Sequence, residues 1–203
     1  MYVPAHFRAD DRAQQLAFMR AHPFVMLVTA PDGVPFATHL PVLIEEGVDG
    51  NVHLRSHLAR ANPQWRHFAS GQDVLVVFHG PHALIDPAWY DSAPNVPTWN
   101  YAAVHATGPA RVVGGDETRR IALALVEHFT PDMAALPPDS LRRMLAGVVT
   151  FEVQVRGVQG KLKLSQNKTA ADRANVRAAL AASPHGEERE TAALMAQVEA
   201  ARS

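Results

Sequence analysis

The sequence predicts a mixed α+β fold, mainly β, in which a β-barrel or β-sandwich is decorated by helices. At least six short β-rich segments are separated by turn signals, a pattern typical of barrels and sandwiches. Helical segments do not alternate regularly with these strands, which disfavours a single layer of βαβ units. The hydrophobic fraction of 47% over 203 residues is ample for a core.

The chain is predicted to begin with a helix and then a hairpin. Asp10 and Asp11 can cap a helix whose apolar residues recur at helical spacing, and Pro23 ends it. Two β-rich runs, 24–30 and 35–45, flank the turn signal Pro-Asp-Gly. We therefore expect these runs to pair as a hairpin.

The next elements are a strand, a short helix and a buried strand. Residues 52–57 alternate in polarity as a half-buried strand does. Asn62 is a plausible cap for a helix over 63–69, with Pro63 at its first position. The continuous apolar run 73–80 has the length of a buried strand.

The second half of the chain combines strands with helices. A long strand is predicted over 98–114, where Gly108-Pro109 suggests a bulge or bend. Asp116 opens a helix, a shorter one covers 140–145, a strand covers 148–158, and two helices follow Thr169, separated by 183–186. We expect residues 1–168 to form the ligand-binding domain and residues 169–203 a helical extension packed on it.

Composition narrows the function classes. The formal net charge of −1 gives no general attraction to nucleic acid. The C-terminal helix pair is not read as a DNA-binding helix-turn-helix, because its second helix would begin with Glu187, Glu188 and Glu190, which DNA phosphates would repel. The chain has no cysteine, so disulfides and thiolate chemistry are excluded. No apolar run is long enough for a membrane span and no signal peptide is visible, so we expect a cytoplasmic protein.

The segment 78–108 concentrates the aromatic residues. It holds two of the three tryptophans and two of the three tyrosines, with prolines that pin it as loop and short strand. Its His79 and His82, with Asp86 and Asp91 in reach, could form a metal site, but their spacing matches no metal motif. Loop histidines bound within the protein are the favoured interpretation.

The segment 54–65 is the best candidate for anion binding. A strand delivers Arg55, Ser56 and His57 to its end, and Arg60 and Asn62 follow before a helix. Hydroxyl and guanidinium donors suit a phosphate group. The alternative is an ordinary capped turn with solvated arginines.

Two further segments could contact a ligand. In the strand that begins at Trp99-Asn100-Tyr101, Trp99 and Tyr101 share one face and Asn100 takes the other. This pattern suits a planar heteroaromatic ligand, although Trp99 could equally belong to the core. The polar block KLKLSQNK (161–168) could contact a ligand edge or be a solvated basic loop.

Taken together, these blocks resemble the PaiB-type FMN-binding negative transcriptional regulators. The resemblance rests on MYVPAHF, THLPVL (38–43), HLARANPQW (57–65), VVFHGPHALIDPAWY (76–90), VPTWNYAAVHATG (96–108) and KLKLSQNK, in that order over residues 1–180. It implies an FMN-binding split β-barrel related to pyridoxamine phosphate oxidase, working as a homodimer with FMN at the subunit interface. Its implied FMN contacts are His39, Leu40, Arg55, Ser56, His57, Arg60, Asn62, Trp99, Asn100, Lys163, Ser165, Gln166 and Asn167.

The resemblance leaves the activity open between three hypotheses. The first is a dimeric negative transcriptional regulator, with DNA as a partner implied by the resemblance alone. The second is a flavin-dependent oxidoreductase, although no catalytic acid or base pair stands out. The third is a barrel that no longer binds flavin, since His57 replaces the cationic residue usual in relatives and is mostly neutral at pH 7.

Overall fold

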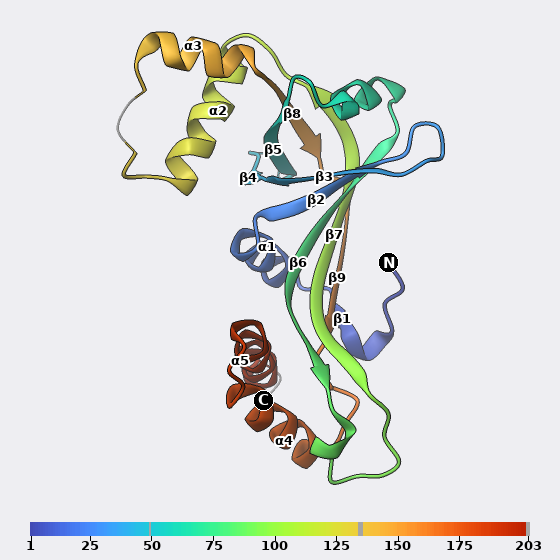
Figure 1. Ribbon diagram of the computed structural model, residues 1–203. Helices are drawn as coiled ribbons and strands as arrows, with labels where there is room; N and C mark the ends of the chain where they lie inside the picture. Colours follow the sequence, from blue (N-terminus) through green and yellow to red (C-terminus); the bar gives the residue numbers. More distant parts are fainter. Residues whose placement is uncertain (49, 134–135, 202–203) are drawn as a thin grey trace. The chain divides into compact units, whose positions relative to one another are not determined.

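The computed structural model describes residues 1–48, 50–133 and 136–201 (Figure 1). The α-helices among them are α1 (Arg12–Ala21), α2 (Asp116–Phe129), α3 (Pro138–Ala146), α4 (Ala170–Ala181) and α5 (Gly186–Ala200). Short 3-10 helices are η1 (Ala5–Phe7), η2 (Pro63–Ser70) and η3 (Pro87–Trp89). The strands are β1 (Arg8–Ala9), β2 (Phe24–Thr29), β3 (Phe36–Pro41), β4 (Leu43–Glu46), β5 (Val52–Ala59), β6 (Asp73–Ile85), β7 (Thr98–Val112), β8 (Val148–Gln154) and β9 (Gly157–Lys163). The predicted mixed α+β fold is confirmed.

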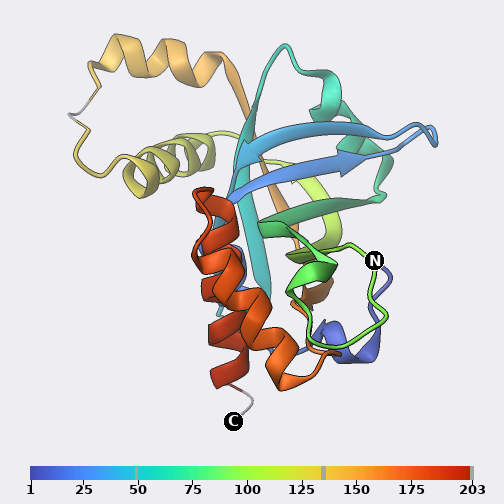
Figure 2. The same cartoon turned by 60° about the horizontal axis from the view of Figure 1, so that its bottom comes forward.

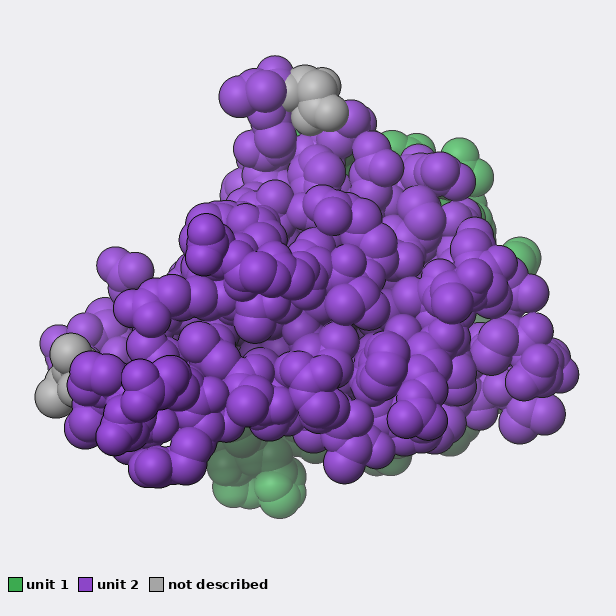
Figure 3. Space-filling model, turned by 90° about the horizontal axis from the view of Figure 1, so that it is seen from above, with its two compact units in different colours: residues 1–15, 79–104, 159–203 green, residues 16–78, 105–158 purple. Residues whose placement is uncertain are grey.

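The chain folds into two compact units, each built from separate stretches of sequence. Unit 1 comprises residues 1–15, 79–104 and 159–203, and unit 2 comprises residues 16–78 and 105–158 (Figure 3). The long strands β6 and β7 each contribute residues to both units. The division at residue 168 expected from the sequence stays a prediction.

Unit 2 contains an antiparallel sheet with the strand order β3-β2-β6-β7-β8-β5-β4. The predicted hairpin is confirmed, with Phe24 opposite Pro41 and Thr29 opposite Phe36. The predicted single strand 35–45 is wrong, because it divides into β3, which pairs with β2, and β4, which pairs with β5. The two halves are joined at Val42, whose N–H donates to the Pro23 carbonyl.

Two other strand boundaries differ from the sequence prediction. The strand predicted over 73–80 continues to Ile85 as β6, and the strand predicted over 148–158 ends at Gln154, before β9. Strand β7 passes through Gly108 without interruption. A Cβ at Gly108 would lie 1.9 Å from the backbone oxygen of Gln154, so close approach of the backbone explains the glycine.

The helices of unit 2 are positioned by local signals that the sequence carries. Asn62 caps η2 by accepting a hydrogen bond from the Gln64 N–H at 3.0 Å, as predicted. The buried Gln64 side chain then donates to the carbonyls of Leu27 and Phe36, which ties η2 to the β2–β3 hairpin. Helix α2 packs Ile121 and Leu125 into an apolar cluster with Leu43 of β4 and Val113, which follows β7.

In unit 1, strand β1 pairs with β9, and α4 and α5 form an antiparallel pair (Figure 2). Thr169 caps α4, and Arg173 and Arg177 of that helix both bind Glu199 of α5. The beginning of α4 also holds the loop that follows η3, because Asp172 accepts hydrogen bonds from the N–H groups of Asp91 and Ser92.

None of the helices in the described part of the chain is both long and apolar enough to cross a membrane.

Candidate functional site

The residues implied as FMN contacts fall into two groups, one in each unit. Those in unit 2 are His39, Leu40, Arg55, Ser56, His57, Arg60 and Asn62. Those in unit 1 are Trp99, Asn100, Lys163, Ser165, Gln166 and Asn167. We describe each group within its own unit.

The strand β3 carries the first two residues of the unit 2 group. Leu40 is buried, whereas His39 is exposed and stacks against Phe24 with ring centroids 6.3 Å apart. Strand β3 ends the strand order, so one of its backbone edges lacks a strand partner among the described residues. Such an edge can offer main-chain donors and acceptors to the polar edge of a planar ligand.

Arg55 does not offer its charge to a ligand in this structure. Its guanidinium pairs with Glu45 and, at 2.8 Å, with Glu152, which is only 3% exposed. Burial alone would raise the pKa of Glu152, but hydrogen bonds from Arg55 and Arg111 outweigh burial and lower it. The charge of Arg55 is therefore balanced within the protein.

The neighbouring Ser56 and Arg60 also bind protein groups. Ser56 is fully buried and its hydroxyl donates to the Pro41 carbonyl at 2.5 Å. The Arg60 guanidinium donates through Nε to Ala146 and through Nη2 to Val148, both carbonyl contacts being 2.7 Å. Its third nitrogen, Nη1, makes no hydrogen bond within the described residues, so Arg60 keeps donors for an anion.

His57 also has an unused polar atom. Its Nδ1 is buried and has no hydrogen-bond partner among the described residues. Burial lowers the pKa of His57, so the ring is neutral at pH 7. A neutral imidazole suits a polar flavin atom better than it suits a phosphate. Both polar atoms of the Asn62 side chain are used, because its oxygen caps η2 and its nitrogen donates to the Thr38 hydroxyl at 2.9 Å.

In unit 1, four of the six implied residues line one pocket of about 350 Å³, which we call the lysine pocket. They are Asn100, Lys163, Ser165 and Asn167. Asn100 is fully buried and exchanges hydrogen bonds with the Ser165 hydroxyl at 3.0 and 3.1 Å. Ser165 itself adopts a left-handed conformation with φ of 64°, which turns the chain after β9.

The other two implied residues of unit 1 do not line the lysine pocket. Trp99 is 51% exposed, on the face opposite Asn100 as the strand alternation predicts, and only its carbonyl binds Lys163. Gln166 is used by its own loop, since its side chain donates to the Leu162 carbonyl and accepts from the Leu164 N–H. Gln166 therefore shapes the pocket loop.

Tyr90, Asn95 and Lys168 also line the lysine pocket, although none of them is among the FMN contacts that the resemblance implies. Tyr90 is 8% exposed, and its buried hydroxyl has no hydrogen-bond partner among the described residues. The concentration of aromatic residues over 78–108 was a signal for Tyr90, and the lysine-rich block 161–168 was one for Lys168. Neither signal shows that the two side chains meet, with the Lys168 ammonium 4.7 Å from the Tyr90 ring centroid.

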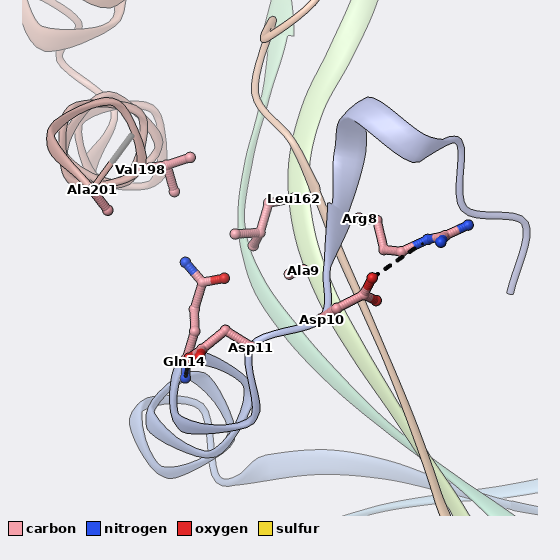
Figure 4. A pocket seen from close by; sticks show the side chains of 8 residues that line it. All are labelled: Arg8, Ala9, Asp10, Asp11, Gln14, Leu162, Val198 and Ala201. Atoms are coloured by element: carbon pink, nitrogen blue, oxygen red, sulfur yellow. Dashed lines mark hydrogen bonds and ion pairs between the residues drawn. The ribbon is translucent and has the colours of Figure 1, made fainter. Parts of the chain in front are cut away.

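A second pocket of unit 1, about 440 Å³, involves none of the implied contacts (Figure 4). Its charged residues are engaged by the fold, because Arg8 pairs with Asp10 at 3.9 Å and Asp11 caps α1. Leu162 and Val198 contribute apolar surface. Among the described residues, none of its side chains is a buried polar group without a hydrogen-bond partner.

The histidines considered for metal binding are engaged by other side chains. His79 and His82 lie with ring centroids 5.1 Å apart, and His82 Nδ1 pairs with Glu187 at 2.6 Å. Among the described residues no three potential metal-ligating side chains gather in one place. The ring contact and the pair with Glu187 place both histidines against other side chains of unit 1.

Comparisons with known proteins give the family context. A family model described as "Putative FMN-binding domain" matches residues 1–157. The chain is 38% identical over 182 residues to "Protease synthase and sporulation protein PAI 2" of Bacillus subtilis, covering 87% of each chain.

Solved structures share the fold at low identity. The flavocytochrome Anf3 of Azotobacter vinelandii matches with a TM-score of 0.63 and 16% identity, covering 85% of this chain and 78% of that one. The FAD and heme binding protein of Mycobacterium smegmatis matches with a TM-score of 0.62 and 18% identity, covering 82% of this chain and 78% of that one.

Proposed function

Because the chain belongs to the FMN-binding domain family, we propose that it is a PaiB-type negative transcriptional regulator that works as a homodimer. It has the flavin-binding split-barrel fold, and FMN is the cofactor of its family. The observation that carries the regulatory proposal is the 38% identity, over 87% of both chains, to a protein named for protease synthase and sporulation.

The residues of unit 2 fit an FMN contact in two respects. The unpaired edge of β3 at His39 and Leu40 can meet the polar edge of the isoalloxazine ring. The partnerless Nδ1 of His57 can meet a flavin polar atom, and Arg60 can reach the phosphate through Nη1. Arg55, Ser56 and Asn62 would then hold the segment in position through their contacts within the protein. FMN, when bound, supplies reversible electron transfer.

The sequence offers no dedicated DNA-reading element, so we propose that any effect on a promoter needs a surface built by two protomers or a partner protein. Gel retardation of the protein's own promoter region, with FMN-loaded and FMN-free protein over a range of salt, tests this. We expect retardation that weakens as salt rises, because phosphate contacts release counterions. Equal retardation of promoter and random DNA would refute sequence-specific regulation.

The FMN-loaded protein also tests the alternative function, a flavin-dependent oxidoreductase. Bound flavin that is reduced by a nicotinamide cofactor faster than free FMN would favour a flavin-dependent oxidoreductase. Colourless protein that added FMN does not saturate would refute both functions.

A further inference from the structure

All three lysines of the chain lie within the eight residues 161–168. Every other basic charge apart from histidine is an arginine, and several of those arginines pair with glutamates. The lysines differ, since none of them has a carboxylate within 4.0 Å among the described residues. Lys163 and Lys168 both line the lysine pocket, beyond residue 157, where the match to the family model ends.

The ammonium groups of the lysine pocket are bound to neutral acceptors only. Lys163 Nζ donates to the Thr98 hydroxyl at 2.6 Å and to the Trp99 carbonyl at 2.5 Å, and Lys168 Nζ donates to the Asn95 side-chain oxygen. Each ammonium has three N–H donors, so both retain at least one. Burial, followed by the charges of Lys161 and Lys168, lowers the pKa of Lys163. Lys163 and Lys168 therefore bring two ammonium groups to one pocket with no carboxylate in contact with either among the described residues.

The acidic residue that could have neutralised this cluster is committed elsewhere. Asp172 lies at the start of α4, four residues after Lys168, and is fully buried. Its two carboxylate oxygens accept from the N–H groups of Asp91 and Ser92 and from the Ser92 hydroxyl. These bonds hold the loop that carries Tyr90 and Asn95 against the pocket.

The pocket also contains a neutral donor without a partner. The Tyr90 hydroxyl is buried and has no hydrogen-bond partner among the described residues, which is unfavourable for a polar group. A ligand oxygen would satisfy it. Two ammonium groups and one phenol hydroxyl match the three terminal oxygens of a phosphoryl group, while the rings of Phe7 and Tyr90 add apolar walls.

We propose that the lysine pocket binds a phosphoryl group through Lys163, Lys168 and the Tyr90 hydroxyl. Its source is either the phosphate of FMN or a separate phosphorylated ligand. The first source rests on the proposed function, whereas the second does not.

The test uses the full chain labelled with [13Cε]lysine, which yields three side-chain NMR signals, one for each lysine. Inorganic phosphate is titrated at constant ionic strength, with chloride as the control anion. We expect saturable shifts of the Lys163 and Lys168 signals and a smaller shift of Lys161, whose Nζ binds the Tyr2 carbonyl. Shifts that do not saturate, or that chloride reproduces, would overturn the proposal.

Three variants sharpen the result. Lys163→Gln and Lys168→Gln should each lower phosphate affinity about tenfold or more, because each removes one charge-assisted hydrogen bond. Tyr90→Phe keeps the ring and should lower affinity about fivefold. Arg142→Gln, on α3 of unit 2 and paired with Asp139, is the matched control and should leave affinity unchanged. The proposal would also be overturned if Tyr90→Phe and a lysine variant that still folds both bound phosphate as tightly as the wild type.

FMN and riboflavin then distinguish the two sources. If FMN displaces phosphate and riboflavin does not, the pocket holds the cofactor's own phosphate. If FMN binds without changing phosphate affinity, the pocket serves a separate ligand. Failure of FMN to bind, with phosphate still bound, would reject the proposed function and leave the pocket standing. The converse result, with FMN bound and no lysine signal shifted by either ligand, would reject the pocket alone.

Discussion

Arg60 is placed to act twice, on the stability of unit 2 and on the affinity for FMN. Its guanidinium holds the carbonyl of Ala146, the last residue of α3, and that of Val148, the first residue of β8. Charge-assisted hydrogen bonds contribute up to about 1.5–3 kcal/mol each, and solvent exposure of Arg60 reduces this to roughly 0.5–1 kcal/mol each. We therefore expect Arg60→Ala to lose about 1–2 kcal/mol, which is a fall of about 3–6 °C in Tm.

The second consequence concerns the cofactor. If Nη1 of Arg60 binds the FMN phosphate, Arg60→Ala should weaken FMN binding about tenfold or more. Quenching of flavin fluorescence measures the affinity, and circular dichroism at the same temperature shows that the variant is folded. Arg142→Ala is the control, because Arg142 is exposed and its pair with Asp139 is worth about 0.5 kcal/mol. Equal FMN affinities for the two folded variants would remove Arg60 from the cofactor site and leave it only a structural role.

Three further predictions concern the fold that positions these groups. Gly108→Ala should destabilise by about 3 kcal/mol, since the added Cβ would lie 1.9 Å from a backbone oxygen; Gly114→Ala, with open space around it, should be neutral or slightly stabilising in the same urea titration. The pKa of Asp172 is lowered from 3.8 to about 2, chiefly by the hydrogen bond from a serine hydroxyl, so its contribution to stability is complete above about pH 4 and is lost as the pH falls through 2. Thermal melting should therefore show the difference between wild type and Asp172→Asn shrinking over that range, and a constant difference would contradict this assignment. Asn62→Ala should lower the free energy of unfolding by about 1–2 kcal/mol. Asn62→Asp should lower it less, because aspartate keeps the cap and loses only the donor to Thr38. Equal losses for the two variants in chemical denaturation would show that the cap contributes little.

The local features of the fold could be predicted because their causes lie within a few residues. The caps at Asp11 and Asn62 depend on an oxygen and an N–H two or three positions away. The alternation that buries Asn100 and exposes Trp99 follows from the pleat of one strand. The division of 35–45 into two strands could not be predicted, because both halves have β-forming residues and the choice of neighbouring strand is a tertiary property.

The partners of the candidate site residues could not be predicted from the sequence either, because they are also set by tertiary contacts. The donors of Arg55 are evident from its residue type, but its acceptors, Glu45 and Glu152, lie 10 and 97 positions away. A guanidinium in the pattern of a phosphate site can therefore be neutralised by residues that no local motif includes. The unpaired hydroxyl of Tyr90 is likewise a property of what surrounds it.

The balance of charge within each unit bears directly on where an anion can bind. In unit 2, Arg55 of the predicted phosphate segment is paired with the half-buried Glu45 and the buried Glu152, so a phosphate at Arg55 would have to compete with carboxylates already in contact. In unit 1 the lysines keep unused N–H donors, and the acid close to them in sequence, Asp172, is bound to a loop instead. An incoming phosphoryl group gains the full attraction of Lys163 and Lys168 and displaces no ion pair. Electrostatics therefore favours the lysine pocket over Arg55 as the stronger anion site. Of the two arginines in the 55–62 segment, Arg60 can contact FMN phosphate through Nη1 without breaking a bond within the protein, whereas Arg55 cannot.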